Sequence, residues 1–240
     1  MQAMDLLEKT VYKAVGANPA HVANLLQRAQ ELDEKQIRYE HYQRFGEDVI
    51  RLVYDRNIEQ RILLAVMQVF SEGLEDCLYA NEEVSLPQEI VRLLQQQGKR
   101  LSTAESFTGG GISAAITSVS GASSVFFEGL NTYHEEAKVK RLGVRRETLQ
   151  KYGAVSKETV HEMALGLLST GDCDLAVSTT GIAGPNSDIT GFPVGLCFIG
   201  IGDKERVKIY RYRFEGDRET VTQTAIRYAL FLTYKHLKNI

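Results

Sequence analysis

Beyond residue 87 the sequence alternates short apolar runs with segments of helical periodicity. Five apolar runs predict strands, at residues 101–105, 125–133, 175–180, 194–202 and 207–214. Five other segments predict helices, at residues 88–97, 108–118, 135–142, 157–169 and 218–237. Strands interleaved with helices indicate an α/β fold, a layered sheet with helices on both faces.

The last two predicted strands are joined by only a few residues, GDKER. Parallel strands need a crossover of a dozen residues or more, whereas antiparallel strands can be joined by a tight turn. We therefore expect these two strands to form an antiparallel hairpin, which makes the sheet mixed.

The first 85 residues follow a different pattern, which predicts a separate small domain. Apolar positions recur at helical spacing over residues 3–14, 19–36 and 58–79, and residues 48–54 alternate like a strand. The next stretch, ANEEVSLP, is polar and ends at Pro87, which is typical of a domain boundary. We predict a small α+β domain at 1–85 and an α/β domain at 86–240.

Composition excludes several classes of protein. Hydrophobic residues are 43% and charged residues 25% of the 240, which is ordinary usage for a folded domain. No apolar run approaches the length of about 18 residues that a membrane helix needs, and the opening MQAMDLLEKT does not resemble a signal peptide. The three cysteines form no CxxC pair, as expected in a reducing compartment. We expect a cytoplasmic protein with no membrane partner.

The net charge of −3 is unevenly distributed. Residues 1–86 carry 9 basic and 15 acidic side chains, whereas residues 87–240 carry 19 and 16. An acidic region is repelled by the phosphates of nucleic acid, while a mildly basic region tolerates a phosphorylated small molecule. We therefore expect no nucleic-acid partner.

Signatures of common cofactor sites are absent from the sequence. It has no GxxxxGK[ST] loop, no GxGxxG, no GxSxG elbow and no SxxK. The segment HEMAL, from His161, lacks the last residue of the zinc-protease motif HExxH. The sequence therefore predicts neither a bound cofactor nor a metal.

The segment LSTAESFTGGG, residues 101–111, is the first candidate for chemistry. A strand that ends at Glu105 leaves Ser106 at its tip, and the glycines after it open a helix. Backbone N–H groups could then face the ligand of a nucleophilic Ser106, as in an oxyanion hole. A plain strand-to-helix turn with Ser106 or Thr108 as N-cap explains the same residues. Glu105 either orients the turn or is a solvated charge.

The segment NTYHEEAK, residues 131–138, is the second candidate. Tyr133 would end a strand, and Lys138 would lie about one turn into the next helix. In a dry pocket near a helix start, a lysine loses stabilisation of its charge, so its pKa falls and it can accept a proton. Ser106, Tyr133 and Lys138 would then form a site. Alternatively, Lys138 pairs with Glu135 on an exposed helix face.

Two further segments are typical of ligand-binding loops. TTGIAGP, residues 179–185, follows an apolar strand and carries Thr180 and Gly181 where the backbone can approach a ligand. FEGDR, residues 214–218, places Arg218 at the start of the last helix. Because a cation is disfavoured at a helix start, Arg218 either binds an anion there or is a surface residue.

Seven blocks in this order and spacing resemble the CinA C-terminal domain, the family of nicotinamide-nucleotide amidases (NMN deamidases). They cover about residues 86–240 and read TAESFTGG, SGASS, TYHEEAKVKRLGV, GAVS, TGIAGP, PVG and GDR. The resemblance implies a three-layer α/β/α domain with a mixed sheet. It also implies hydrolysis, without a metal, of nicotinamide mononucleotide to nicotinate mononucleotide and ammonia in pyridine-nucleotide recycling.

The resemblance also implies roles for individual residues. Ser106 would be the nucleophile, Tyr133 and Lys138 its acid–base partners, and Arg218 a substrate-binding group. The N–H groups near Thr108, Gly109 and Gly110 would hold the oxyanion, and the nucleotide pocket would be lined by Gly121, Thr180 and Gly181. Which of Tyr133 and Lys138 takes the proton stays open.

Three departures from the family pattern bear on the pocket. Phe107 stands where cysteine is usual, His134-Glu135 replaces Ser-Asn, and residues 186–192 replace a loop richer in glycine. Two alternatives therefore stay open: a catalytically silent relative that serves as an interaction or scaffold protein, and an amidase for another small substrate.

The first 85 residues resemble the KH-like domain that precedes the amidase domain in longer CinA proteins. RNA-binding KH domains carry a GxxG loop, but here the glycines at 16, 46 and 73 are far apart. We expect this domain to pack or dimerise rather than bind RNA, and the protein to be a homodimer.

Overall fold

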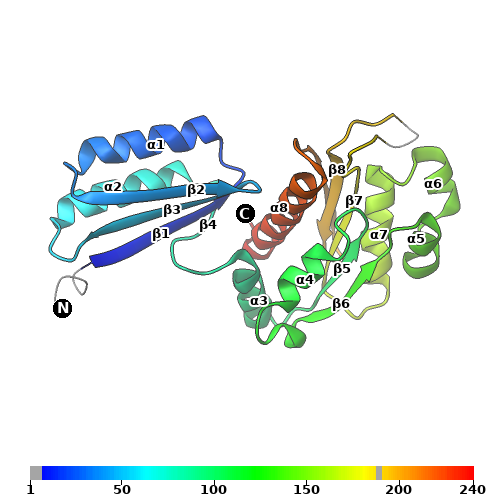
Figure 1. The fold of residues 1–240 in the computed structure, drawn as a ribbon. Helices are drawn as coiled ribbons and strands as arrows, with labels where there is room; N and C mark the ends of the chain where they lie inside the picture. Colours follow the sequence, from blue (N-terminus) through cyan, green and yellow to red (C-terminus); the bar gives the residue numbers. More distant parts are fainter. Residues whose placement is uncertain (1–6, 188–190) are drawn as a thin grey trace. The chain divides into compact units, whose positions relative to one another are not determined.

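The computed structural model (Figure 1) describes residues 7–187 and 191–240. It divides into two compact units, Met1–Ser85 and Leu86–Ile240. The start of the helix predicted over 3–14 and the centre of the loop at 186–192 lie outside the described residues. In the described part of the chain, no helix has both the length and the apolar character needed to cross a bilayer.

The first unit is a four-stranded antiparallel sheet with two helices on one face (Figure 1). In the spatial order β2-β3-β1-β4, its strands are β2 (Ile37–Arg44), β3 (Glu47–Asp55), β1 (Leu7–Val15) and β4 (Leu78–Ala80). Its helices are α1 (Pro19–Leu32) and α2 (Gln60–Gly73). Alternate residues of the central strands and one stripe of each helix form an apolar core, in which the tilted rings of Tyr12 and Phe70 have their centroids 5.3 Å apart.

The helix predicted over residues 3–14 is wrong, because its described part lies in β1. This strand pairs with β3 over its whole length, from Leu7 opposite Asp55 to Val15 opposite Glu47. The spacing of apolar side chains within a short segment gives no information about a strand that is distant in the sequence. Here the backbone hydrogen bonds to β3 determine that the segment is extended.

Two other expectations for the first unit need correction. The long helix predicted over 58–79 ends at Gly73, where a Cβ would lie 2.4 Å from Leu25, and the chain then forms β4 beside β1. Strand β2 was not predicted, because only Ile37 of its eight residues is buried and the strand has no apolar alternation. It is an edge strand of the sheet.

The second unit has a five-stranded mixed sheet. In the spatial order β6-β5-β7-β8-β9, its strands are β6 (Phe126–Asn131), β5 (Leu101–Glu105), β7 (Leu175–Gly181), β8 (Leu196–Gly202) and β9 (Val207–Arg213). Strand β5 is parallel to β6 and β7, and β8 is antiparallel to β7 and β9. The predicted hairpin and the mixed sheet are confirmed.

Helices cover both faces of this sheet and complete the predicted three layers (Figure 1). One side carries α3 (Leu86–Gln97), α4 (Gly111–Thr117) and α8 (Arg218–Lys238); the other carries α5 (Glu135–Leu142), α6 (Arg146–Tyr152) and α7 (Lys157–Ser169). A short 3₁₀ helix, η1 (Ala122–Ser124), precedes β6. Central strands β5 and β7 are buried on both faces, although each carries polar residues among its apolar ones.

Parallel strands bring distant segments of the sequence to one edge of this sheet. The carboxyl ends of β5, β6 and β7 lie at the same edge, so the segments after residues 105, 131 and 181 come together. Ligands of open α/β sheets bind at this edge.

Candidate active site

The carboxylate of Glu105 organises the turn that carries Ser106. Glu105 is fully buried and accepts hydrogen bonds from the backbone N–H groups of Ile112 (3.0 Å) and Ser113 (2.8 Å), and from the Ser113 hydroxyl (2.7 Å). It therefore satisfies N–H groups at the start of α4 that a side-chain N-cap would otherwise satisfy. Glu105 therefore orients the turn, and the alternative that it is a solvated charge is wrong.

Neither Ser106 nor Thr108 is the N-cap of α4. That position is Gly110, at φ 92°, which makes no side-chain hydrogen bond. The Thr108 hydroxyl instead bonds the Thr179 hydroxyl of β7 at 2.7 Å and ties the turn to the sheet. The plain capping interpretation of this segment is therefore wrong, and the Ser106 hydroxyl is available for other partners.

Lys138 is the partner that the fold brings to Ser106. Its Nζ lies 3.0 Å from Ser106 Oγ, 2.7 Å from the carbonyl oxygen of Thr132 and 3.4 Å from that of Tyr133. The Lys138 side chain is 1% exposed, so the alternative of an exposed Lys138–Glu135 pair is wrong. Three residues separate the end of β6 from the start of helix α5, whose first turn places this lysine at the carboxyl edge of the sheet.

Burial sets the proton affinity of the lysine. Loss of hydration lowers the pKa of Lys138 from its usual 10.5 to about 8, and the negative charge of Glu135 opposes that shift. No carboxylate forms a hydrogen bond with this amine among the described residues. Two carbonyls accept its N–H bonds, so in the neutral amine the lone pair faces the Ser106 hydroxyl.

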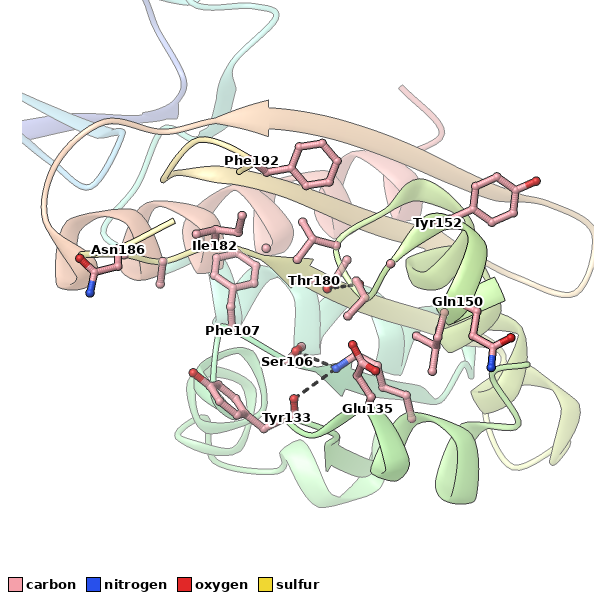
Figure 2. A pocket seen from close by; sticks show the side chains of 18 of the residues that line it. Ser106, Phe107, Tyr133, Glu135, Gln150, Tyr152, Thr180, Ile182, Asn186 and Phe192 are labelled. Atoms are coloured by element: carbon pink, nitrogen blue, oxygen red, sulfur yellow. Dashed lines mark hydrogen bonds between the residues drawn. The ribbon is translucent and has the colours of Figure 1, made fainter. Parts of the chain in front are cut away.

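The hydroxyl of Tyr133 is not directed at Ser106. It accepts a hydrogen bond from the Arg218 guanidinium (2.9 Å), which also donates to the carbonyl oxygen of Gly184 (2.7 Å). The Tyr133 side chain is 59% exposed, and Figure 2 shows its hydroxyl pointing away from Ser106. Only its backbone carbonyl contacts Lys138. The geometry therefore favours Lys138 over Tyr133 as the proton acceptor.

The glycine turn supplies unpaired backbone donors next to Ser106. Gly109, at φ 64°, donates its N–H to the Ser106 carbonyl at 3.0 Å. In the described part of the chain, the N–H groups of Phe107, Thr108 and Gly110 meet no acceptor. Donors for an oxyanion are therefore present, although the predicted Gly109 N–H is already engaged.

A cavity of about 670 Å³ opens above Ser106 and Lys138. Figure 2 shows Ser106 and Glu135 on one side of it and Phe192 and Tyr152 across from them. Thr180 and Gly181 line it as predicted, and so does Arg218. A cavity of this size and mixed character suits a small-molecule ligand.

Not all of the predicted pocket residues reach this cavity. Thr108, Gly109 and Gly110 do not line it, although their neighbour Phe107 does. Gly121 lies before η1 at the amino edge of the parallel strands, where Leu101 is paired with Phe126, whereas Ser106 follows their carboxyl ends. The assignment of Gly121 to this pocket is therefore wrong.

Helix α6 forms a wall of the cavity that the sequence did not predict. Gln150, Lys151 and Tyr152 line it together with the turn after the helix. This seven-residue helix is polar and buries only Thr148. Its sequence therefore lacks the periodic apolar residues that would predict a helix. The GAVS block at 153–156 was the single signal for this wall.

Two of the sequence departures have structural explanations. His134 caps α5, because its Nδ1 accepts the N–H of Glu136 at 3.1 Å; it is not a base for Ser106. Phe107 packs with Ala183, Cys197, Val221 and Ala225 in an apolar cluster beside the cavity. In the altered loop, Asn186 and Phe192 line the cavity, while residues 188–190 lie outside the description.

All of these site residues lie within the part of the chain that matches known proteins. Residues 83–237 match the model of the CinA C-terminal domain. A CinA-like protein from Kosmotoga olearia is 38% identical over 192 residues, 79% of this chain and 47% of the relative. One from Endomicrobium trichonymphae is 43% identical over 168 residues, 70% of this chain and 39% of the relative. The chain thus spans less than half the length of these curated relatives.

Solved structures agree with the sequence match. The crystal structure of the competence damage-inducible protein A from Klebsiella pneumoniae has a TM-score of 0.62 and 37% identity, and covers 64% of this chain and 95% of that one. A second protein of the CinA superfamily from Klebsiella pneumoniae has a TM-score of 0.63 and 35% identity, and covers 65% of this chain and 97% of that one.

Proposed function

This chain belongs to the CinA family through its C-terminal domain, and from that premise we propose that its second unit hydrolyses the carboxamide of nicotinamide mononucleotide. The products would be nicotinate mononucleotide and ammonia, as the resemblance of its motifs implies. The observation that carries the proposal is the contact between Ser106 Oγ and a buried lysine amine at 3.0 Å. A serine is a weak nucleophile until a neighbouring base accepts its proton.

Acyl transfer would begin with the neutral form of Lys138. The Ser106 hydroxyl donates its proton to the amine while Oγ attacks the carboxamide carbon, and the carbonyl oxygen becomes an oxyanion. The unpaired N–H group of Phe107, the residue next to Ser106 that lines the cavity, is the nearest backbone donor along the chain for that oxyanion. Such preorganised donors commonly contribute a rate factor of about 10² to 10³.

Collapse of the tetrahedral intermediate would break the bond between carbon and nitrogen. The protonated Lys138 returns its proton to the leaving nitrogen, and ammonia departs from the Ser106 acyl-enzyme. A water then attacks the ester, with Lys138 again as base, and releases the carboxylate product and the free serine. No oxidant, cofactor or metal enters the balance of these two steps.

Arg218 would bind the phosphate of the nucleotide. Its guanidinium lines the cavity and is held by Tyr133 and the carbonyl of Gly184. Both partners are neutral acceptors, and among the described residues no carboxylate pairs with this guanidinium. A guanidinium held in this way is suited to a phosphate group, which also explains a cation at the start of α8.

The proposal is tested by measuring ammonia release from nicotinamide mononucleotide with the wild-type protein and two serine variants. Ser106→Ala is expected to lose activity by at least about 10³-fold. Ser118→Ala, an exposed serine at the end of α4, is the matched control and should keep wild-type activity. Circular dichroism of each variant checks the fold.

A second substrate distinguishes the alternatives. Nicotinamide riboside lacks the phosphate, so its kcat/KM should be lower by about 10²-fold if Arg218 binds that group. Equal rates on the two substrates would favour an amidase for another small molecule. No ammonia from a folded wild-type protein would overturn the proposal and favour the catalytically silent alternative.

A further inference from the structure

Glu135 places an exposed, unpaired carboxylate on the lining of the cavity. It lines the cavity from the first turn of α5. In the part of the chain that the structure describes, its carboxylate takes part in no hydrogen bond or ion pair, whereas the adjacent Glu136 pairs with Arg146. Its charge is therefore available to a ligand.

This carboxylate lies at the reacting end of the cavity. Glu135 precedes Lys138 by three residues, so both side chains lie on one face of α5, and its charge acts on the Lys138 amine. Figure 2 shows it on the same side of the cavity as Ser106. Besides Lys138 itself, two basic residues line the cavity, Lys151 and Arg218, and both belong to other helices.

The cavity thus offers opposite charges to the two ends of a ligand. A carboxamide carbon held against Ser106 places the ring that carries it beside Glu135, while a phosphate is attracted to Arg218. The ring of nicotinamide mononucleotide is a pyridinium cation, and its phosphate is an anion. Complementary charges of this kind contribute to specificity and to the orientation of a ligand.

We propose that Glu135 is a specificity-determining residue that selects a cationic ring next to the scissile carboxamide. The inference rests on the proposed function and names a feature of the substrate that this site requires. A ring of the same shape without the positive charge would gain nothing from Glu135. Reduced nicotinamide mononucleotide, which keeps the carboxamide and the phosphate but has an uncharged ring, is the matched probe.

The test measures binding in the absence of turnover. In the 240-residue Ser106→Ala protein, the Kd values of nicotinamide mononucleotide and its reduced form are measured by calorimetry, with and without Glu135→Gln. The substitution should weaken binding of the cationic nucleotide about tenfold, the scale of one partly screened charge interaction. It should change the Kd of the reduced nucleotide by less than about twofold.

The outcomes separate this inference from the proposed function. If the cationic nucleotide binds and Glu135→Gln leaves the ratio of the two Kd values unchanged, the role of Glu135 is overturned and the proposed function stands. If neither nucleotide binds to the folded protein, the proposed function fails and the inference fails with it. Glu147→Gln removes an equal charge from α6 outside the cavity lining and should leave both Kd values unchanged.

A second readout uses the active protein. Glu135→Gln removes the negative charge that holds the pKa of Lys138 up, so the rising limb of kcat/KM should move to lower pH. Other ionisable groups that line the cavity are unchanged in this variant: Tyr133, Lys151, Tyr152 and Arg218. A limb that stays in place would show that the Glu135 charge does not act at the reacting centre.

Discussion

The two units of this chain bury different kinds of side chain. In the described part of the first unit, the buried polar residues are two, Asp33 and Asp48, and the core is otherwise apolar. The second unit buries a lysine, two glutamates and a series of hydroxyl side chains, many of them at the carboxyl edge of its sheet. Burying polar groups costs stability unless each one finds a partner. Buried polar groups are therefore concentrated in the second unit, where the candidate site lies.

Replacement of the buried lysine should produce the largest change. Lys138→Met keeps the length of the side chain but removes the base, so ammonia release should fall by about 10³-fold or more. The melting temperature of the second unit should stay the same or rise, because an apolar side chain has no charge to desolvate. Parallel activity and calorimetric measurements check both; a loss of fold would contradict the expectation.

Truncation in the first core should give the reverse result. Phe70 belongs to α2 and its side chain is fully buried in the core of the first unit. Phe70→Ala should therefore lower the free energy of unfolding of this unit by about 3 to 5 kcal/mol. The kcat of the second unit should be unchanged. Denaturant unfolding followed alongside ammonia release tests this; lost activity in a protein whose second unit is folded would assign the first unit a catalytic role.

A substitution at Glu105 would show how far stability and activity are linked in the second unit. Glu105→Gln turns an amide group toward N–H and hydroxyl donors that now have a carboxylate acceptor. We expect a loss of about 1 to 3 kcal/mol in stability, together with a reduced kcat because the turn carries Ser106. Glu128→Gln, on the neighbouring strand β6, should change neither the melting temperature nor kcat.

The pH dependence of activity should reflect the buried lysine. Because burial lowers the pKa of Lys138 to about 8, kcat/KM should rise about tenfold per pH unit below that value and level off above it. A rising limb near pH 10 or higher would mean that the amine has its ordinary hydration.

Stability should depend on pH in the same direction, with a smaller effect. The unfolded chain holds the Lys138 proton up to its usual pKa of 10.5, and the folded chain releases it at about 8. Between these values the unfolded state binds more protons, so the free energy of unfolding rises with pH. The cost of the buried charge is fully present below pH 8. Lys138→Met should remove this contribution, as calorimetry at a series of pH values would show.

Local sequence was sufficient for several elements of the second unit. Helices α5 and α7 have the predicted bounds, because their ends are made by neighbouring residues. His134 and Ser156 accept N–H groups at the two helix starts, and Gly143 ends α5 in the left-handed region. Such caps join residues only three or four positions apart, so the capping residue and the group that it bonds lie in the same short segment of the sequence.

Sheet pairing in the first unit depended on distant residues. Residues 7–14 of the predicted helix form a strand because β3 lies beside them, and the polar strand β2 exists because β3 offers its other edge. A local window contains neither partner. The entropy lost in closing such loops is compensated only when the whole sheet and its helices assemble.

The candidate site divides in the same way. Motif order pointed to Ser106, Lys138 and Arg218, because the residue types and their places at element ends are visible in the sequence. The assembled sheet decided three other features of the site. Lys138, and not the Tyr133 hydroxyl, contacts Ser106; Gly121 lies at the opposite edge of the sheet; and α6 lines the cavity. The physical reason is that proximity and burial, which set the pKa of the lysine, arise when segments far apart in the chain exclude water together.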